Sequence, residues 1–357
     1  MHKYENLNPI FIGGTGRSGT TIISKFIGTH DEVVKIPIES RYIIDKNGLL
    51  DLFDSLTKNY SLDQARVAIR DFEHKIQDMS NPYKAPYLSW DIEKIIDKSR
   101  FLKYTEELIN DLTYGTFESV DYSTQDKYNI HFIRKLSVPA NLVLGKLSEL
   151  IMNKKISIFG TSLKNKKPKE KMYIPKYYEN EQELVELLKV FTLNIFSGIF
   201  EEKNEIKAWC EDTPANILNI HFLQKIFPEA KYVHIMRHPV AVAYSFKKVF
   251  WAPNNLKQCC DLLDGLYGRL MDVHKKYNGS ENYLFIKLED LANEKQQKNF
   301  VEFLELDTKK FSGEVSIDLA RMNYFIKEMS KKDIDYVQNR LSKYISFFDY
   351  DFINNNK

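Results

Sequence analysis

The sequence has few cysteines, no excess of charge of either sign and no long apolar run. Three cysteines occur among 357 residues, at Cys210, Cys259 and Cys260. An odd, sparse set with two adjacent members forms neither a disulfide framework nor the spacing of zinc ligands, so buried thiols in a reducing compartment fit best. Lysine and arginine together number 51, and aspartate and glutamate 49. Without a net positive field, non-specific binding of nucleic acid is disfavoured.

No membrane partner and no targeting segment are expected. The first apolar run begins at Pro9 and is short, and no run approaches the roughly 18 apolar residues of a membrane span. Hydrophobic residues make up 43% of the chain and charged residues 28%, which is typical of a globular protein. We therefore expect a soluble, cytoplasmic protein. The sequence does not indicate its oligomeric state.

The chain opens with a strand, a glycine-rich turn and a helix. Residues 9–12 form an apolar run typical of a buried strand, and residues 13–19 contain four glycines. Residues 20–27 carry apolar side chains at helical spacing, and Gly28 ends that pattern. A β-branched run at residues 32–38 predicts a second strand.

The pattern from about residue 48 to 203 is mostly helical and contains no chemical motif. Apolar residues at spacings of three and four predict helices at 63–79, 91–109, 142–152 and 181–200. A lysine-rich segment at residues 164–171 is either a solvated loop or a mobile loop that attracts an anionic ligand. We expect this insertion to shape an acceptor pocket.

Strands and helices alternate again after residue 205. Strands are predicted at 231–236 and 282–288, with helices at about 214–227, 239–250 and 295–304. In the helix at 214–227, Thr213 is a good N-cap and Pro214 suits the first position. Alternation of this kind implies a parallel sheet that helices cover on both faces. The sequence thus predicts one α/β domain over residues 1–357, with C-terminal helices at about 305–350.

The glycine-rich turn has the composition of an anion-binding loop. Its backbone N–H groups and the positive end of the following helix together form a cradle, usually for phosphate. Gly14, Gly19 and Thr21 match the spacing of the GxxxxGK[ST] motif, but Thr20 stands where a triphosphate kinase has its lysine. Arg17, inside the loop, supplies the cation instead.

A second pair of candidate residues is Arg237 and Ser245, eight residues apart. Arg237 follows a predicted strand, at the edge where parallel sheets bind ligands. Ser245 lies two turns into the next helix. The two side chains could share one phosphate, although a structural salt bridge would also explain Arg237 taken alone.

Together, the two motifs resemble those of the PAPS-dependent sulfotransferases, where PAPS is 3′-phosphoadenosine 5′-phosphosulfate. PIFIGGTGRSGTT looks like the family's 5′-phosphosulfate loop, and FPEAKYVHIMRHPVAVAYS looks like its 3′-phosphate motif. Further similar segments are WCEDTPANIL, YLFIKLEDL and RLSKYISFFDY. The resemblance covers roughly residues 8–45 and 205–350, and in motif it is nearest to the tyrosylprotein and bacterial enzymes.

The resemblance implies a P-loop-kinase-like fold with a five-stranded parallel sheet, its cofactor-binding elements at about 8–45 and 205–300. It implies transfer of a sulfuryl group from PAPS to a hydroxyl or amine, release of 3′-phosphoadenosine 5′-phosphate (PAP), and no required metal. Arg237 and Ser245 would hold the 3′-phosphate. The 5′-phosphosulfate would be held by Gly14, Thr15, Gly16, Arg17, Ser18, Gly19, Thr20 and Thr21. The alternatives are a kinase that uses ATP and an inactive nucleotide-binding scaffold.

Glu39 is the candidate general base, with Arg17 as the catalytic cation. Glu39 follows the second predicted strand, and its Glu-Ser-Arg run resembles a Glu-Thr-Arg run of the tyrosylprotein enzymes. The small-molecule enzymes use a histidine in a Lys-Thr-His segment, but the corresponding place here is Asp212-Thr213-Pro214. A surface glutamate paired with Arg41 is the alternative interpretation.

Asp212 is the main departure from the family's pattern, because many relatives have a lysine at this place. Arg17 could act alone on the leaving group, or Lys207 or a lysine of the 164–171 segment could reach in. Asp212 could bind a cationic acceptor, assist as a base, or be an acid favoured at a helix start. Arg41, Asp212 and Trp251 are predicted on the acceptor side, although Trp251 could also belong to the core. The acceptor itself, whether a small molecule, a sugar or a peptide tyrosine, is not indicated.

Overall fold

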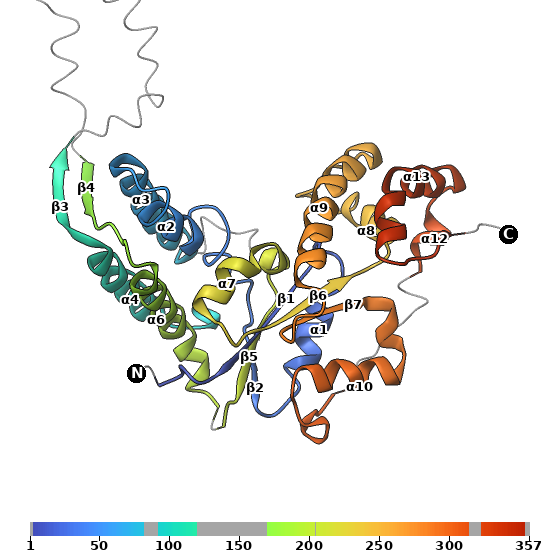
Figure 1. The fold of residues 1–357 in the computed structure, drawn as a ribbon, viewed down its shortest axis with the longest axis horizontal. Helices are drawn as coiled ribbons and strands as arrows, with labels where there is room; N and C mark the ends of the chain where they lie inside the picture. Colours follow the sequence, from blue (N-terminus) through green and yellow to red (C-terminus); the bar gives the residue numbers. More distant parts are fainter. Residues whose placement is uncertain (1–2, 82–91, 120–169, 204, 314–322, 354–357) are drawn as a thin grey trace, which may run out of the picture.

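The protein is described by a computed structural model that covers residues 3–81, 92–119, 170–203, 205–313 and 323–353 (Figure 1). A five-stranded sheet lies at its centre, and each neighbouring pair of strands is parallel. In spatial order the strands are β2 (Val33–Lys35), β5 (Ala208–Glu211), β1 (Asn8–Gly13), β6 (Lys231–Met236) and β7 (Tyr283–Lys287). The predicted α/β class with a central parallel sheet, flanked by helices, is confirmed.

Apolar side chains cover both faces of this sheet, which explains why its strands are nearly continuous apolar runs. On one face, Ile12 belongs to the same buried cluster as Ile23 of helix α1 (Thr20–Ile27). On the other face, Phe11 packs edge-on against Trp209, with ring centroids 5.3 Å apart. The two clusters fix the strands, and with them the loops that leave their carboxyl ends.

Helices and short 3-10 turns connect the later strands. After β5 come η3 (Pro214–Asn219), α7 (Ile220–Ile226), α8 (Pro239–Phe246), α9 (Leu256–Tyr277), η4 (Leu288–Ala292), α10 (Glu294–Phe303), η5 (Thr308–Lys310), α12 (Phe325–Glu328) and α13 (Lys331–Phe347). Within the described ranges, none of the helices has a stretch long and apolar enough to cross a bilayer.

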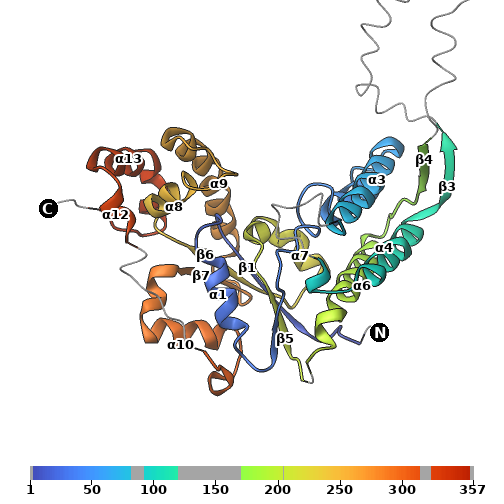
Figure 2. The ribbon, with the colours of Figure 1, turned by 180° about the vertical axis from the view of Figure 1, so that it is seen from behind.

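The segment between β2 and β5 is mostly helical and contains one pair of strands. Its elements are α2 (Leu49–Leu56), α3 (Leu62–Met79), η1 (Ile92–Lys94), α4 (Lys98–Leu112), β3 (Thr113–Ser119), β4 (Glu170–Pro175) and α6 (Glu181–Phe200). Both views show α3, α4 and α6 grouped on one side of the molecule and α8, α9 and α13 on the other (Figures 1 and 2). The predicted helices at 63–79 and 181–200 are present, whereas the one predicted at 142–152 lies outside the described residues.

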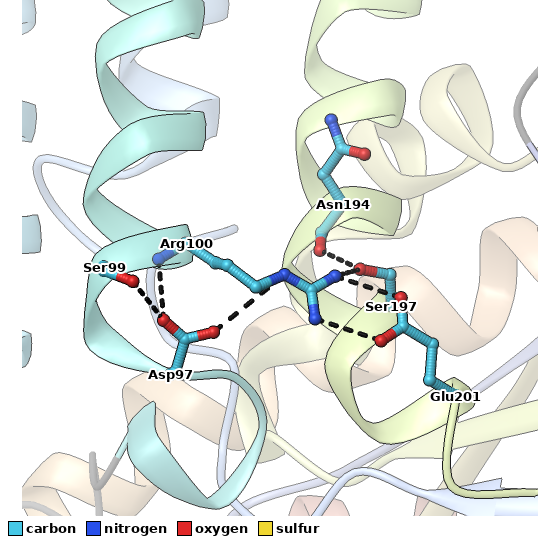
Figure 3. Close-up of polar contacts among 6 residues, drawn as sticks. All are labelled: Asp97, Ser99, Arg100, Asn194, Ser197 and Glu201. Carbon is cyan, nitrogen blue, oxygen red and sulfur yellow. Dashed lines mark hydrogen bonds and ion pairs between the residues drawn. The ribbon is translucent and has the colours of Figure 1, made fainter.

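A charged contact fastens α4 to α6 (Figure 3). The Arg100 guanidinium donates from both terminal nitrogens to the Glu201 carboxylate, each at 3.0 Å, and also to Ser197 Oγ at 3.0 Å. Asp97, the N-cap of α4, accepts from the Arg100 backbone N–H at 3.0 Å. A bidentate arginine–carboxylate pair fixes geometry as well as adding energy, so the two helices are held in register.

Several predicted boundaries are wrong. The helix expected to run to about residue 250 ends at Phe246. Thr213 does not cap the next helix through its side chain, because its hydroxyl bonds to the Glu211 carboxylate, and a 3-10 turn starts at Pro214 instead. The strands β3 and β4, an antiparallel pair, were not predicted.

Candidate functional site

The glycine-rich turn between β1 and α1 has the backbone path that its sequence suggests. Gly16, Arg17 and Gly19 have φ values of 72°, 56° and 103°, in the left-handed region that glycine enters most readily. Gly14 is closely enclosed, because a Cβ placed there would lie 2.2 Å from the carbonyl oxygen of Ile235. The path of residues 13–19, called the anion loop below, therefore depends on its glycines.

The anion loop ends at a helix start that has no side-chain cap. Gly19 is the N-cap of α1 and has no side chain to offer, and the first N–H groups of a helix lack intrahelical partners. The hydroxyl of Ser18 is fully buried and has no hydrogen-bond partner among the described residues. A phosphate or sulfate group would satisfy both sets of donors.

Arg17 connects the anion loop to α8. Its Nε donates a hydrogen bond to Ser245 Oγ at 2.9 Å, across 228 positions of sequence. Arg17 is exposed and Ser245 is half-buried. One residue predicted for the 5′-phosphosulfate and one predicted for the 3′-phosphate are thus in direct contact.

Arg237 directly follows β6, at the carboxyl edge of the sheet. Burial lowers the pKa of its guanidinium, the negative charge of Glu289 opposes this, and the positive charge of Arg17 adds to it. Glu289 accepts hydrogen bonds from the His238 backbone N–H at 2.9 Å and from the Tyr350 hydroxyl at 3.3 Å. Two neighbouring cations at one sheet edge favour an anionic ligand.

Glu39 lies beyond the end of β2, at the same edge, and is half-buried. Burial raises the pKa of its carboxyl, the charge of Arg41 lowers it, and the charges of Asp212 and Asp45 raise it further. A carboxylate with a raised pKa is a stronger base near neutral pH. The Arg41 guanidinium forms an ion pair with Asp45 at 2.5 Å.

Asp212 is buried, with 5% of its surface exposed, and its Oδ2 accepts a hydrogen bond from Ser24 Oγ at 2.8 Å. This contact joins the end of β5 to the middle of α1.

The idea that Lys207 replaces the family's lysine is wrong, because Lys207 precedes β5 at the opposite edge of the sheet and pairs with Glu32 at 2.8 Å.

The remaining predicted acceptor-side residue, Trp251, lies on the surface. Trp251 is 55% exposed and packs edge-on against Phe246, and its neighbour Phe250 is 79% exposed. The alternative core role for Trp251 is therefore wrong.

Of the lysine-rich segment, residues 164–169 lie outside the described residues. Lys171 belongs to β4 and pairs with Glu73 at 3.3 Å.

Glu211, the last residue of β5, was not predicted as a site residue. It is 1% exposed, and its carboxylate accepts hydrogen bonds from Ser40, Thr213 and Asn216. These donors come from two segments that are about 170 residues apart in sequence, so no local pattern could reveal the contact. The one sequence signal for Glu211 is its place directly before Asp212, which stands where many relatives have a lysine.

A family model described as "Sulfotransferase family" matches residues 149–309, a range that contains Arg237 and Ser245 but not the anion loop. No curated protein matches the chain by sequence.

Solved structures that are similar to the chain include three sulfotransferases or sulfotransferase domains. Sulfotransferase STF9 from Mycobacterium avium is 13% identical, with 98% of this chain and 80% of that chain covered and a TM-score of 0.42. The sulfotransferase domain of the Synechococcus PCC 7002 olefin synthase is 15% identical, with 99% and 98% covered and a TM-score of 0.47. The sulfotransferase domain from the curacin biosynthetic pathway is 12% identical, with 97% and 99% covered and a TM-score of 0.43. Over residues 149–309, less than half of its length, the chain is therefore similar to the sulfotransferase family.

Proposed function

We propose that this enzyme transfers a sulfuryl group from PAPS to a hydroxyl or amine acceptor and releases PAP. The hydrogen bond between Arg17 and Ser245 carries the proposal, because it brings residues suited to the two phosphate positions of one nucleotide within 2.9 Å. The single-domain organisation over residues 1–357, with an acceptor-side insertion at about 48–203, is part of the same proposal.

The anion loop stabilises the leaving group. Sulfuryl transfer breaks the bond between sulfur and the bridging phosphate oxygen, and negative charge builds on that oxygen as PAP forms. By analogy with loose phosphoryl transfer, fixed N–H donors and a cation at this oxygen lower the barrier. Arg17, the Ser18 hydroxyl and the first N–H groups of α1 supply those donors.

Glu39 takes the acceptor's proton. As the acceptor oxygen forms its bond to sulfur, it loses a proton that a nearby base must accept. The raised pKa of Glu39, which burial causes, supports this role. Arg41, Asp212 and Trp251 are proposed to lie along the acceptor's approach.

Two experiments test the proposal. Calorimetry with PAP and with ATP–magnesium separates a sulfotransferase from a kinase, and we expect binding of PAP alone. A screen of small phenols, sugars and tyrosine peptides with PAPS, read by a mass gain of one sulfuryl group, identifies the acceptor. Binding of ATP–magnesium without PAP would favour the kinase, and PAP binding without transfer to any acceptor would favour a scaffold.

A further inference from the structure

Glu211 is a buried carboxylate at the carboxyl edge of the sheet. It lies between the segment that carries the proposed base, Glu39, and the turn that follows β5. It ends β5, the strand between β2 and β1 (Figure 1). A carboxylate that is 1% exposed is costly to bury unless hydrogen bonds satisfy it. The donors that surround Glu211 therefore indicate what it holds in place.

The first donor is the backbone N–H of Ser40, which bonds to Glu211 Oε1 at 2.7 Å. Ser40 directly follows Glu39, so this bond fixes the peptide that carries the proposed base. A contact to a backbone N–H does not depend on the side chain of Ser40. It therefore acts on the path of the chain itself.

The other donors belong to the turn that follows β5. The Thr213 backbone N–H bonds to Oε1 at 3.1 Å, the Thr213 hydroxyl donates to the same oxygen, and Asn216 Nδ2 donates to Oε2. The same Asn216 amide also donates to the carbonyl of Ile12 at 3.4 Å, at the end of β1.

The turn is bonded to the anion loop as well. The backbone N–H of Gly14 donates to the carbonyl of Pro214 at 2.8 Å. A continuous chain of hydrogen bonds thus runs from the peptide after Glu39, through Glu211 and the turn at residues 213–216, to the anion loop.

We propose that Glu211 is a positioning residue for sulfuryl transfer, which fixes the distance between the base at Glu39 and the anion loop. The proposal rests on the proposed function, because it takes Glu39 as the base. The acceptor oxygen, which the base must reach, and the leaving oxygen must stand in line through the sulfur, and a displacement of about 1 Å costs on the order of 100-fold in rate.

The test uses Glu211→Gln in the full chain. Glutamine keeps a carbonyl oxygen for Ser40 and Thr213 but turns an NH₂ group toward the Asn216 amide, so that a donor faces a donor. Asn216 cannot turn its amide over without losing its bond to Ile12. Glu32→Gln is the matched control, since Glu32 is also buried and paired but lies at the opposite edge of the sheet.

Four quantities are measured for each variant: the affinity for PAP, kcat and KM with PAPS and the acceptor found by the screen, and the rates of amide hydrogen exchange. For Glu211→Gln we expect kcat to fall about 10- to 100-fold. PAP affinity and KM should stay within about twofold of wild type, because lost alignment affects the transition state and not the binding of the ground state. Exchange should become faster in residues 36–45 and 211–216. Glu32→Gln should change neither kcat nor exchange in these segments.

An unchanged kcat in Glu211→Gln would overturn the proposal, whatever the exchange shows, and so would unchanged exchange in residues 36–45. A loss of PAP affinity equal to the loss of rate would also overturn it, because Glu211 would then support the nucleotide site alone. Failure of the wild-type protein to bind PAP would instead contradict the proposed function. The exchange experiment needs no ligand, so it reports on the Glu211 contacts in either case.

Discussion

The Arg17 Nε lies 2.9 Å from the Ser245 Oγ, and this bond joins the anion loop to the helix that follows β6. The loop that ends β1 and the helix after β6 meet because β1 and β6 are neighbours in the sheet. Ser245 accepts the bond, so its own hydroxyl hydrogen stays available to donate to a phosphate.

Arg17→Ala should lower kcat more than it lowers PAP affinity, because the cation matters most when charge develops on the leaving oxygen. Loss of one such group typically costs roughly 100- to 1,000-fold in rate. Steady-state kinetics and calorimetry on the same preparation measure both effects. An Arg17→Ala variant with wild-type turnover would show that Arg17 does not act on the leaving group.

Glu39→Gln should bind PAP normally and lose on the order of 100- to 10,000-fold in rate, because the amide keeps the size but not the basicity. Burial raises the pKa of Glu39 above its ordinary value of 4.5. The rate depends on the ionised form, so activity should rise with pH through a midpoint above 4.5, and this limb should vanish in the variant.

The comparison variant for the base is Asp212→Asn, which removes a second carboxylate at the same edge. Asp212 accepts a hydrogen bond from Ser24, so we expect this variant to affect the seating of α1 more than the proton transfer. If Asp212→Asn is inactive and Glu39→Gln retains its rate, Asp212 is the base.

Arg237→Ala should weaken PAPS binding about 10- to 150-fold, the value of one charge-assisted contact. Adenosine 5′-phosphosulfate has no 3′-phosphate, so its weaker binding should stay nearly unchanged. Ser245→Ala should act in the same direction but less, since its hydroxyl is neutral. Titration of both nucleotides against both variants measures the difference, and an equal loss for both would mean that Arg237 is structural.

The free energy of unfolding should depend on the ionisation of Glu211. Burial raises the pKa of this carboxyl from 4.5 to about 7, hydrogen bonds from Asn216 and Thr213 oppose the rise, and the charge of Asp212 adds to it. The folded state therefore holds this proton more tightly than the unfolded state. The resulting stabilisation is complete below pH 4.5 and is lost as the pH rises to about 7.

At about 1.4 kcal/mol per pKa unit, this contribution reaches at most about 3.5 kcal/mol. Glu211→Gln cannot ionise at this position. The unfolding free energy of the wild type should therefore fall relative to that of the variant as the pH rises from 5 to 8. Urea unfolding at several pH values measures it. Parallel pH profiles for the two proteins would contradict a shifted pKa at Glu211.

The sequence predicted the parts of the fold that local signals determine. The helix at 20–27 and the strand at 231–236 have the predicted bounds, because a buried run, a glycine turn and a helical period all lie within a few residues. The pair β3 and β4 escaped prediction because most of β3 is exposed and its residues show no apolar alternation.

The contacts within the site depend on strand pairing instead. Arg17 and Ser245 were each predicted separately, but their hydrogen bond requires β1 and β6 to be adjacent. Glu211 meets Ser40 because β2 pairs with β5, and neither residue has a neighbour in sequence that points to the other. The pKa shift of a buried carboxyl likewise follows from tertiary burial, which no short motif encodes.

The central position of β1 has a consequence for synthesis of the protein in the cell. β1 is made first, yet its sheet neighbours β5 and β6 begin about 200 residues later in the chain. At about 5 to 20 residues per second, the ribosome needs roughly 10 to 40 seconds to deliver them. Throughout that interval Ile10, Phe11 and Ile12 lack both partner strands, which makes the nascent chain a substrate for chaperones that bind apolar segments.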